Sequence, residues 1–412
     1  MTASRTRPRT REASVPRATR PARRAIAPRS SAGFAGGAGS ALSLSGCSSL
    51  GTGRLSPGPG PAAKERTRGG GSVFPAAHTP GVAREKNDPG AAPATRLALA
   101  QRALWEAEDV VALGPPGADV ARLGVGAAWI PDAHERAAAK GVAVGGVAYA
   151  GAHEVALTYL PKGTRRRDYV LALACSVAPR VALVGAKKGG IKPGKKALAQ
   201  RGTIRATAAG AHCQIVVADV EQVEAPALER WESRFEVEGL EMVSLPGTFA
   251  AGRLDEGTAR LLEVLELPET GRLLDVGCGA GVLACVAKRR RPGLEVVASD
   301  ADDFAVESTR RSAAANELAV EAMGSDVYAN VPGRFDVIVT NPPFHRGVGT
   351  EYGTARRIAR EAPTKLRRGG TLWMVANHFL PWGEVLEESF AEVERVHAGR
   401  RFKVWRATGA RG

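Results

Sequence analysis

An Asn-Pro-Pro-Phe motif begins at Asn341, directly after the apolar run of residues 336–340. Its two prolines fix φ and remove two backbone donors, so the Asn341 amide and the Pro342 carbonyl are held rigidly at a strand end. These two acceptors can bind both N–H bonds of a conjugated amine and stabilise the charge that develops when its lone pair attacks a methyl group. Phe344 offers a ring on which a flipped base can stack, a contact worth about 1 to 3 kcal/mol. The motif therefore predicts methylation of a base amine.

The same motif has a structural interpretation, a rigid turn followed by a core phenylalanine. The glycine loop that precedes it in the chain favours the catalytic interpretation. His345, the next residue, either contacts the substrate or caps the following helix.

A glycine loop lies between the apolar residues 272–276 and the helical pattern of residues 282–290. Gly277, Gly279 and Gly281 allow a tight turn and a close approach to a ligand, and the N–H groups that begin the helix favour a carboxylate or phosphate. In the dinucleotide fingerprint the third glycine comes three residues after the second. The even spacing by two here leaves less room for a pyrophosphate.

Three aspartates stand beside this loop or at the ends of neighbouring strands. Asp300 ends the strand at residues 294–299, 19 residues after Gly281, and can accept hydrogen bonds from ribose hydroxyl groups. Asp275 can face an ammonium group, and Asp326 can accept from an adenine amine or simply cap a turn or helix. Together with the loop they predict S-adenosylmethionine as the ligand, in preference to a nicotinamide cofactor.

Alternating strands and helices must position these residues. The apolar runs at residues 272–276, 294–299, 336–340 and 371–376 alternate with helical patterns, which predicts a doubly wound parallel sheet with ligands at the carboxyl ends of its strands. A hairpin is expected over residues 393–407. Residues 95–240 mix strands and helices in the same way, so a second α/β domain precedes the first.

A dense basic segment lies inside that earlier domain. Residues 162–201 hold 11 basic residues and one acidic residue, Asp168. Glycines and a proline place part of this charge in a loop, where basic side chains can reach phosphates, although an ordinary solvated surface is the alternative. The candidate RNA contacts are Lys162, Arg165, Lys187 and Lys188.

The first 90 residues differ in composition from the rest. They hold 15 basic and 4 acidic residues, so they carry +11 of the chain's net charge of +15. An Arg-rich, acid-poor start without an apolar segment is typical of an organellar transit peptide, and its prolines favour a chloroplast over a mitochondrion. The alternative is a basic tail that binds RNA loosely. We expect no membrane span, since no uninterrupted apolar run of about 18 residues is present.

The number and spacing of the cysteines argue against disulfide bonds and a cysteine metal site. The five cysteines form no Cys-x-x-Cys pair and are odd in number, so we expect a reducing compartment and no metal site.

Beyond these patterns, residues 240–408 resemble a known family, the bacterial small-subunit ribosomal RNA guanine-N2 methyltransferases of the C type, together with their large-subunit relatives. The matching segments are residues 245–249 (LPGTF), 252–255 (GRLD), 274–283, 341–347 (NPPFHRG), 375–381 and 401–404 (RFKV). Residues 159–162 and 184–188 resemble segments of the family's N-terminal domain.

The resemblance implies a class I, Rossmann-like S-adenosylmethionine methyltransferase domain with a mixed seven-stranded sheet at residues 241–412. It implies a degenerate methyltransferase-like domain at residues 95–240, for RNA binding and folding support. The transit peptide and disordered linker that we expect at residues 1–94 rest on composition alone, since bacterial members of the family have no such basic extension. Asn341, Pro342 and Phe344 would hold a guanine, with Phe249 as a further substrate contact. The glycine loop and Asp300 would hold the methyl donor.

The expected activity is therefore transfer of a methyl group to the N2 amine of a guanine in small-subunit ribosomal RNA. The expected partner is that RNA or the small subunit, and the expected state is a monomer. Adenine-N6 methylation of RNA and glutamine methylation of a protein remain alternatives, since both use the same Asn-Pro-Pro acceptors. A non-catalytic ribosome-assembly factor predicts an eroded donor site, yet the three glycines, Asp300 and Asn341 are all present.

Overall fold

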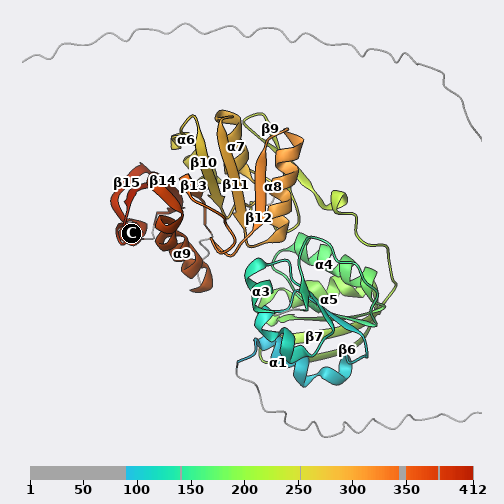
Figure 1. Ribbon diagram of the computed structural model, residues 1–412. Coiled ribbons are helices and arrows are strands. Elements are labelled where there is room, and N and C mark those ends of the chain that lie inside the picture. The colour runs from blue at the N-terminus through green and yellow to red at the C-terminus, as the bar shows by residue number, and fades with distance from the viewer. Residues whose placement is uncertain (1–89, 140–141, 251, 343–348, 379–380, 412) are drawn as a thin grey trace, which may run out of the picture. The chain divides into compact units, whose positions relative to one another are not determined.

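The computed structural model describes residues 90–139, 142–250, 252–342, 349–378 and 381–411. These residues form two seven-stranded sheets with flanking helices and one two-stranded hairpin (Figure 1). The predicted transit peptide and disordered extension lie almost entirely outside the described residues.

The first sheet is built from residues 110–220. Its strands are β1 (Val110–Leu113), β2 (Ala127–Trp129), β3 (Ala143–Val144), β4 (Val155–Tyr159), β5 (Arg180–Ala186), β6 (Gly202–Gly210) and β7 (Cys213–Val220). Its helices are α1 (Pro93–Ala100), α2 (Val120–Leu123), α3 (Ala133–Ala138), α4 (Thr164–Val177) and α5 (Ile191–Ala199). The strand order is β3-β2-β1-β4-β5-β7-β6, in which β7 is antiparallel to both of its neighbours.

The second sheet repeats that plan. Its strands are β10 (Gly271–Val276), β11 (Leu294–Asp300), β12 (Val320–Gly324), β13 (Phe335–Thr340), β14 (Leu366–Asn377), β15 (Phe390–Ala398) and β16 (Phe402–Ala410). Its helices are α6 (Glu256–Val264), α7 (Val282–Arg290), α8 (Asp303–Ala315), α9 (Gly349–Lys365) and α10 (Trp382–Glu387). The order β12-β11-β10-β13-β14-β16-β15 matches the first sheet position by position. This confirms the predicted pair of related α/β domains, the second with a mixed seven-stranded sheet.

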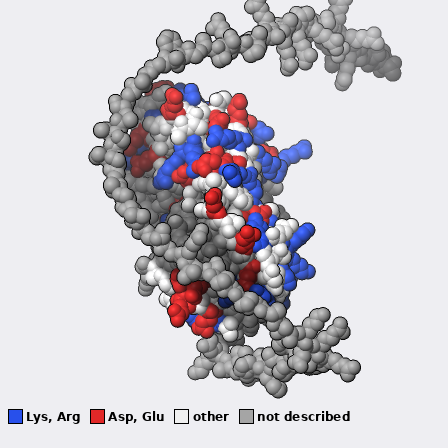
Figure 2. Space-filling view, turned by 90° about the vertical axis from the view of Figure 1, so that its right-hand side faces the viewer, with Lys and Arg blue, Asp and Glu red and all other residues white. Residues whose placement is uncertain are grey.

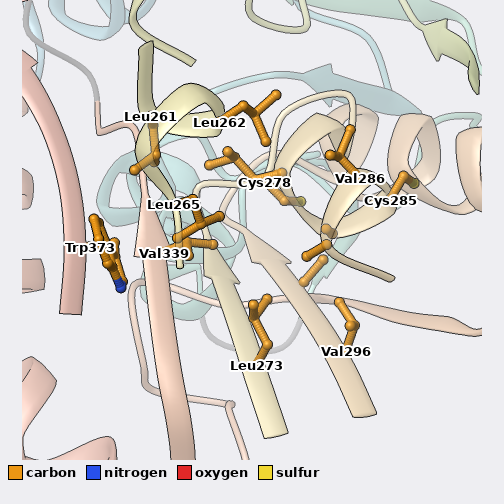
Figure 3. Close-up of a cluster of buried hydrophobic side chains, with 14 of the residues drawn as sticks. Leu261, Leu262, Leu265, Leu273, Cys278, Cys285, Val286, Val296, Val339 and Trp373 are labelled. Atoms are coloured by element: carbon orange, nitrogen blue, oxygen red, sulfur yellow. The ribbon is translucent and has the colours of Figure 1, made fainter. Parts of the chain in front are cut away.

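Strand periodicity explains why both faces of the second sheet are covered. Leu273 and Leu274 are adjacent in β10 and point to opposite faces, where both side chains are fully buried. Leu273 belongs to the cluster formed with α6, α7 and α8, including Leu261 and Val296 (Figure 3), and Leu274 belongs to the cluster formed with α9 and α10. These two layers fix the strand ends that carry the predicted site.

The predicted hairpin at residues 393–407 is present as β15 and β16, which pair antiparallel beside β14. A smaller hairpin, β8 (Ser233–Val237) and β9 (Leu240–Ser244), lies where the chain passes from the first sheet to the second, and the predicted boundary between residues 240 and 241 falls at the start of β9.

Two further findings concern the described part of the chain. None of its helices is long and apolar enough to cross a bilayer. Within the same residues, no group of three or more His, Cys, Asp or Glu side chains could hold a metal ion.

Candidate active site

A pocket opens at the carboxyl ends of β10 and β13. These strands are parallel neighbours with Val276 opposite Thr340, so the segments that follow them meet at one edge of the sheet. The buried Thr340 hydroxyl donates to the Val276 carbonyl at 2.8 Å and ties the two ends together. The pocket is lined by the glycine loop, Asp275, Asn341, Phe249 and the start of α6. The structure thus brings the predicted donor loop and the predicted amine acceptor into one cavity.

The backbone of the loop requires its glycines. Gly277, Gly279 and Gly281 have φ values of 73°, 57° and 79°, a region that L side chains rarely adopt. A Cβ atom at Gly281 would also lie 2.8 Å from the side chain of Thr309 on α8. At Gly277, by contrast, a Cβ atom would meet nothing within 4 Å, so that position is open to a ligand.

Asp300 joins the end of β11 to this loop. One carboxylate oxygen accepts a hydrogen bond from the Gly279 N–H at 3.0 Å, and the other accepts from the Asp302 N–H at 3.0 Å. Burial raises the pKa of Asp300 to about 6, against the effect of these two hydrogen bonds. Each oxygen keeps a lone pair with which it can accept a ribose hydroxyl.

Asp275 is the most deeply buried acid of the pocket, with 1% of its surface exposed. Its Oδ2 accepts a hydrogen bond from the Ala284 N–H at 3.2 Å, while its Oδ1 has no hydrogen-bond partner among the described residues. Burial raises the pKa of Asp275 to about 7, and the nearby charge of Asp300 acts in the same direction. A buried carboxylate oxygen without a partner is costly unless a ligand satisfies it, so this acid fits the ammonium group of S-adenosylmethionine.

Asn341 lines the same pocket as the glycine loop, directly after the end of β13. Its side-chain Nδ2 donates to Asp255 Oδ2 and to Thr258 Oγ1, each at 2.9 Å. Pro342, the next residue, is buried. Phe344 and His345, the other two candidates of the motif, lie outside the described residues. Phe249 is half exposed and lines the pocket, as a substrate contact must.

Asp326 is already engaged by protein groups. It accepts hydrogen bonds from Arg357 on α9 and from His134 on α3, all at 3.0 Å. Burial raises the pKa of its carboxyl group, but the His134 and Arg357 hydrogen bonds outweigh that effect and the net pKa is lowered. Asp326 does not line the pocket that holds Asn341, so its contact with adenine stays a prediction.

The basic segment divides into two parts. On α4, Arg165 donates to Ser233 Oγ and to the Trp231 carbonyl, and Arg166 lies 3.6 Å from the ring centroid of Phe304, so these arginines serve protein contacts. Lys187 and Lys188 are exposed in a short 3₁₀ turn before α5. Lys162 also makes an interaction within the protein. On the face seen in Figure 2, basic and acidic side chains are interspersed.

Asp255 and Thr258 are the pocket residues whose contact with Asn341 the sequence did not predict. In the structure Asp255 caps α6 by accepting a hydrogen bond from the Thr258 N–H, three residues on, at 3.0 Å. Asn341 is 86 residues away from Asp255, and no spacing rule links them.

The comparisons with known proteins agree with this geometry. A family model described as the methyltransferase small domain matches residues 239–406, and the model of its N-terminal domain matches residues 131–235. The ribosomal RNA small subunit methyltransferase C of Pseudomonas entomophila is 36% identical over 332 residues, which cover 77% of this chain and 99% of the relative. Its counterpart from Stutzerimonas stutzeri is 40% identical over 264 residues, or 62% of this chain and 80% of the relative.

A solved structure is similar in both domains. It is a T. thermophilus 16S rRNA N2 G1207 methyltransferase in complex with AdoMet and guanosine, with a TM-score of 0.67, 27% identity, and coverage of 79% of this chain and 93% of that one. The chain is thus an S-adenosylmethionine-dependent methyltransferase, and it belongs to the ribosomal RNA small subunit methyltransferase C family.

Proposed function

We propose that this protein transfers a methyl group from S-adenosylmethionine to the exocyclic N2 amine of a guanine in small-subunit ribosomal RNA. The observation that carries the proposal is that Asn341, the glycine loop and Asp275 line the same pocket. The names of the relatives and the guanosine bound to the T. thermophilus enzyme support guanine as the target base.

Each residue of the pocket would have a separate role in binding or catalysis. Asp275 would hold the donor's ammonium group, Asp300 its ribose hydroxyls, and the loop glycines allow the close approach. The donor supplies an electrophilic methyl group on a sulfonium. The Asn341 side-chain oxygen and the Pro342 carbonyl would accept the two N–H bonds of the amine, turn its lone pair toward the methyl group and stabilise the growing positive charge. A strong base is not needed, because the methylated amine is acidic enough to lose its proton to water.

Two other amines fit the same acceptors. Adenine N6 and a protein glutamine amide each present two N–H bonds on a conjugated nitrogen, so the pocket chemistry described above suits them as well. The relatives' names favour ribosomal RNA over a protein substrate. We also propose an organellar site of action, with a chloroplast favoured, on the basis of the composition of the first 90 residues. We propose that the protein acts as a monomer.

A partition experiment tests the substrate class. The full chain is incubated with isotope-labelled S-adenosylmethionine and, in separate reactions, with small subunits, large subunits, their extracted RNAs, and a release factor. We expect label in small-subunit RNA. Label confined to the release factor would transfer the assignment to glutamine, and label confined to large-subunit RNA would refute the small-subunit target.

The targeting proposal has its own test. Residues 1–90 fused to a fluorescent protein should direct it to chloroplasts in plant cells. Import into mitochondria, or retention of the fusion outside both organelles, would contradict the chloroplast assignment.

A further inference from the structure

The first turn of α6 fixes the side-chain amide of Asn341. We propose that Asp255 and Thr258 are positioning residues that lock this amide in one orientation, with its oxygen presented to the target amine and its nitrogen turned away. The inference rests on the proposed function, because it gives the Asn341 oxygen the task of accepting a hydrogen bond from that amine.

The chemistry of the neighbours identifies the two ends of the amide. An ionised carboxylate only accepts hydrogen bonds, so the Asn341 atom 2.9 Å from Asp255 Oδ2 must be the nitrogen. The second hydrogen on that nitrogen is directed at Thr258 Oγ1, also at 2.9 Å. Both donors of the amide are thereby used, and the oxygen is the group left to face a substrate.

The lock is built on a rigid element. Asp255 Oδ2 also accepts a hydrogen bond from the Thr258 N–H at 3.0 Å, so one carboxylate oxygen caps α6 and holds the Asn341 amide. Thr258 is buried, and the next turns of α6 place Leu261 and Leu262 in the hydrophobic cluster (Figure 3). Movement of this carboxylate would therefore break the N-cap of a helix that is packed into the core.

An unlocked amide would spend part of its time inverted. Inversion points its NH₂ group at the amine's own N–H, so that two donors face each other and the lone pair of the amine is not turned toward the methyl group. In the native structure inversion would also set the amide oxygen against the Asp255 carboxylate. The lock thus raises the fraction of productive complexes and acts on kcat rather than on binding of the methyl donor.

The first test replaces Asp255 in the full chain. Asp255→Asn keeps the size of the side chain and its ability to cap a helix, but the new amide can donate to the Asn341 oxygen and so permits inversion. We expect kcat to fall about tenfold or more, with the dissociation constant of S-adenosylmethionine and the thermal midpoint nearly unchanged. The matched control is Glu256→Gln, which removes a charge from the same turn, where the exposed Glu256 carboxylate pairs with Arg401 and does not contact Asn341. The control should keep kcat within about twofold.

The second test compares two Thr258 variants for which packing alone and the lock predict opposite orders of kcat. Thr258→Val keeps the volume of the side chain and removes the hydroxyl acceptor, whereas Thr258→Ser keeps the hydroxyl and loses a buried methyl group. The lock predicts a higher kcat for the Ser variant than for the Val variant, even where the Ser variant is the less stable. A higher kcat for Val, or an undiminished kcat for Asp255→Asn, would overturn the lock.

The same assays separate this inference from the proposed function. If the product is a methylated amine other than guanine N2, the proposed function fails, while a lowered kcat in Asp255→Asn on that substrate still supports the lock. If guanine N2 is methylated and Asp255→Asn is fully active, the lock alone fails.

Discussion

In the proposed function, the amine chemistry of this protein depends on Asn341. Asn341 would supply one of two acceptors for the target N–H bonds, and groups that stabilise developing charge in a preorganised site contribute about 10²-fold or more to turnover. Asn341→Ala should therefore lower turnover about 100-fold while S-adenosylmethionine binds with nearly unchanged affinity, because the loop and Asp275 are intact. Single-turnover methylation and calorimetric titration measure the two quantities. Turnover equal to that of the native protein would show that Asn341 has no role in the mechanism.

Asp275 and Asp300 make donor binding depend on pH. Burial raises their pKa values to about 7 and about 6, so in the free protein Asp275 is mostly protonated below about pH 7 and Asp300 below about pH 6. The ionised forms are those that bind an ammonium group and ribose hydroxyls. Hence the affinity for S-adenosylmethionine should fall as the pH is lowered through 7 and 6, and be at least about tenfold weaker at pH 5.5 than at pH 8.

Titration in buffers of different ionisation enthalpy checks this prediction, since binding near pH 6 should release protons. Asp275→Asn serves as the control, with weaker binding and a shallower pH dependence. The same pKa shifts act in the opposite direction on stability. Between pH 4 and 7 the native state binds more protons than the unfolded chain, so the free energy of unfolding of the ligand-free protein decreases as the pH rises over this range. A dissociation constant that does not change with pH would contradict the pKa assignment.

At the residue scale, the sequence predicts the chemistry of single positions and misses the contacts between distant ones. The positions of Asp275 and Asn341 in one pocket follow from strand ends that can be read from apolar runs. The bond between Asn341 and Asp255 depends on how α6 lies over the sheet, which no local pattern encodes. The engagement of Asp326 by His134 and Arg357 was missed for the same reason.

The glycine loop and its helix are the elements most sensitive to substitution. Gly281 has a φ of 79° and lies against Thr309 on α8, so Gly281→Ala introduces both backbone strain and a clash. We expect the free energy of unfolding to fall by about 2 kcal/mol and donor affinity to fall with it. Denaturant unfolding with and without S-adenosylmethionine measures both effects.

Gly353 offers the matched control for this substitution. It lies inside α9 with no atom within 4 Å of an added Cβ, so Gly353→Ala should leave stability unchanged or raise it by up to about 1 kcal/mol. Equal stability of the Gly281→Ala and Gly353→Ala variants would show that the loop conformation does not need its glycine.

At the element scale, strands were predicted more fully than helix placement. The runs at residues 272–276, 294–299 and 336–340 correspond to β10, β11 and β13 because parallel strands buried on both faces are continuously apolar. The strand expected before Asp326 is present as the edge strand β12, whose bounds the sequence did not give because its residues are only partly buried and form no continuous apolar run. Packing across the sheet decides which helices lie on the same face as α6, and hydrophobic periodicity in the sequence does not predict it.

At the scale of the whole molecule, the two sheets share one topology but not one chemistry. The glycine pattern follows β10 in the second sheet, and the dense basic segment falls in the first. The sequence could predict this division, because composition and motifs differ between the halves. It could not predict that Arg165 and Arg166 are used in protein contacts, which leaves the lysines around α5 as the stronger candidates for RNA.

Those lysines give a prediction for the assembled molecule. Five of them occupy the 3₁₀ turn and α5, namely Lys187, Lys188, Lys192, Lys195 and Lys196. Replacing all five with Ala should weaken RNA binding and make the negative slope of log K against log salt shallower, by up to about 0.7 to 0.9 for each lysine that neutralises a phosphate. Arg289→Ala, an exposed basic position on α7, is the control and should change the slope by no more than about 0.9. An unchanged slope in the five-lysine variant would show that these lysines form an ordinary solvated surface rather than an RNA-binding one.

The most direct measurement is mass spectrometry of the nucleosides from small-subunit ribosomal RNA after reaction with labelled S-adenosylmethionine and the full chain, with Asn341→Ala run in parallel. The account predicts labelled N2-methylguanosine with the native protein and about 100-fold less with the variant. Labelled N6-methyladenosine in place of N2-methylguanosine, or no labelled nucleoside at all, would contradict it.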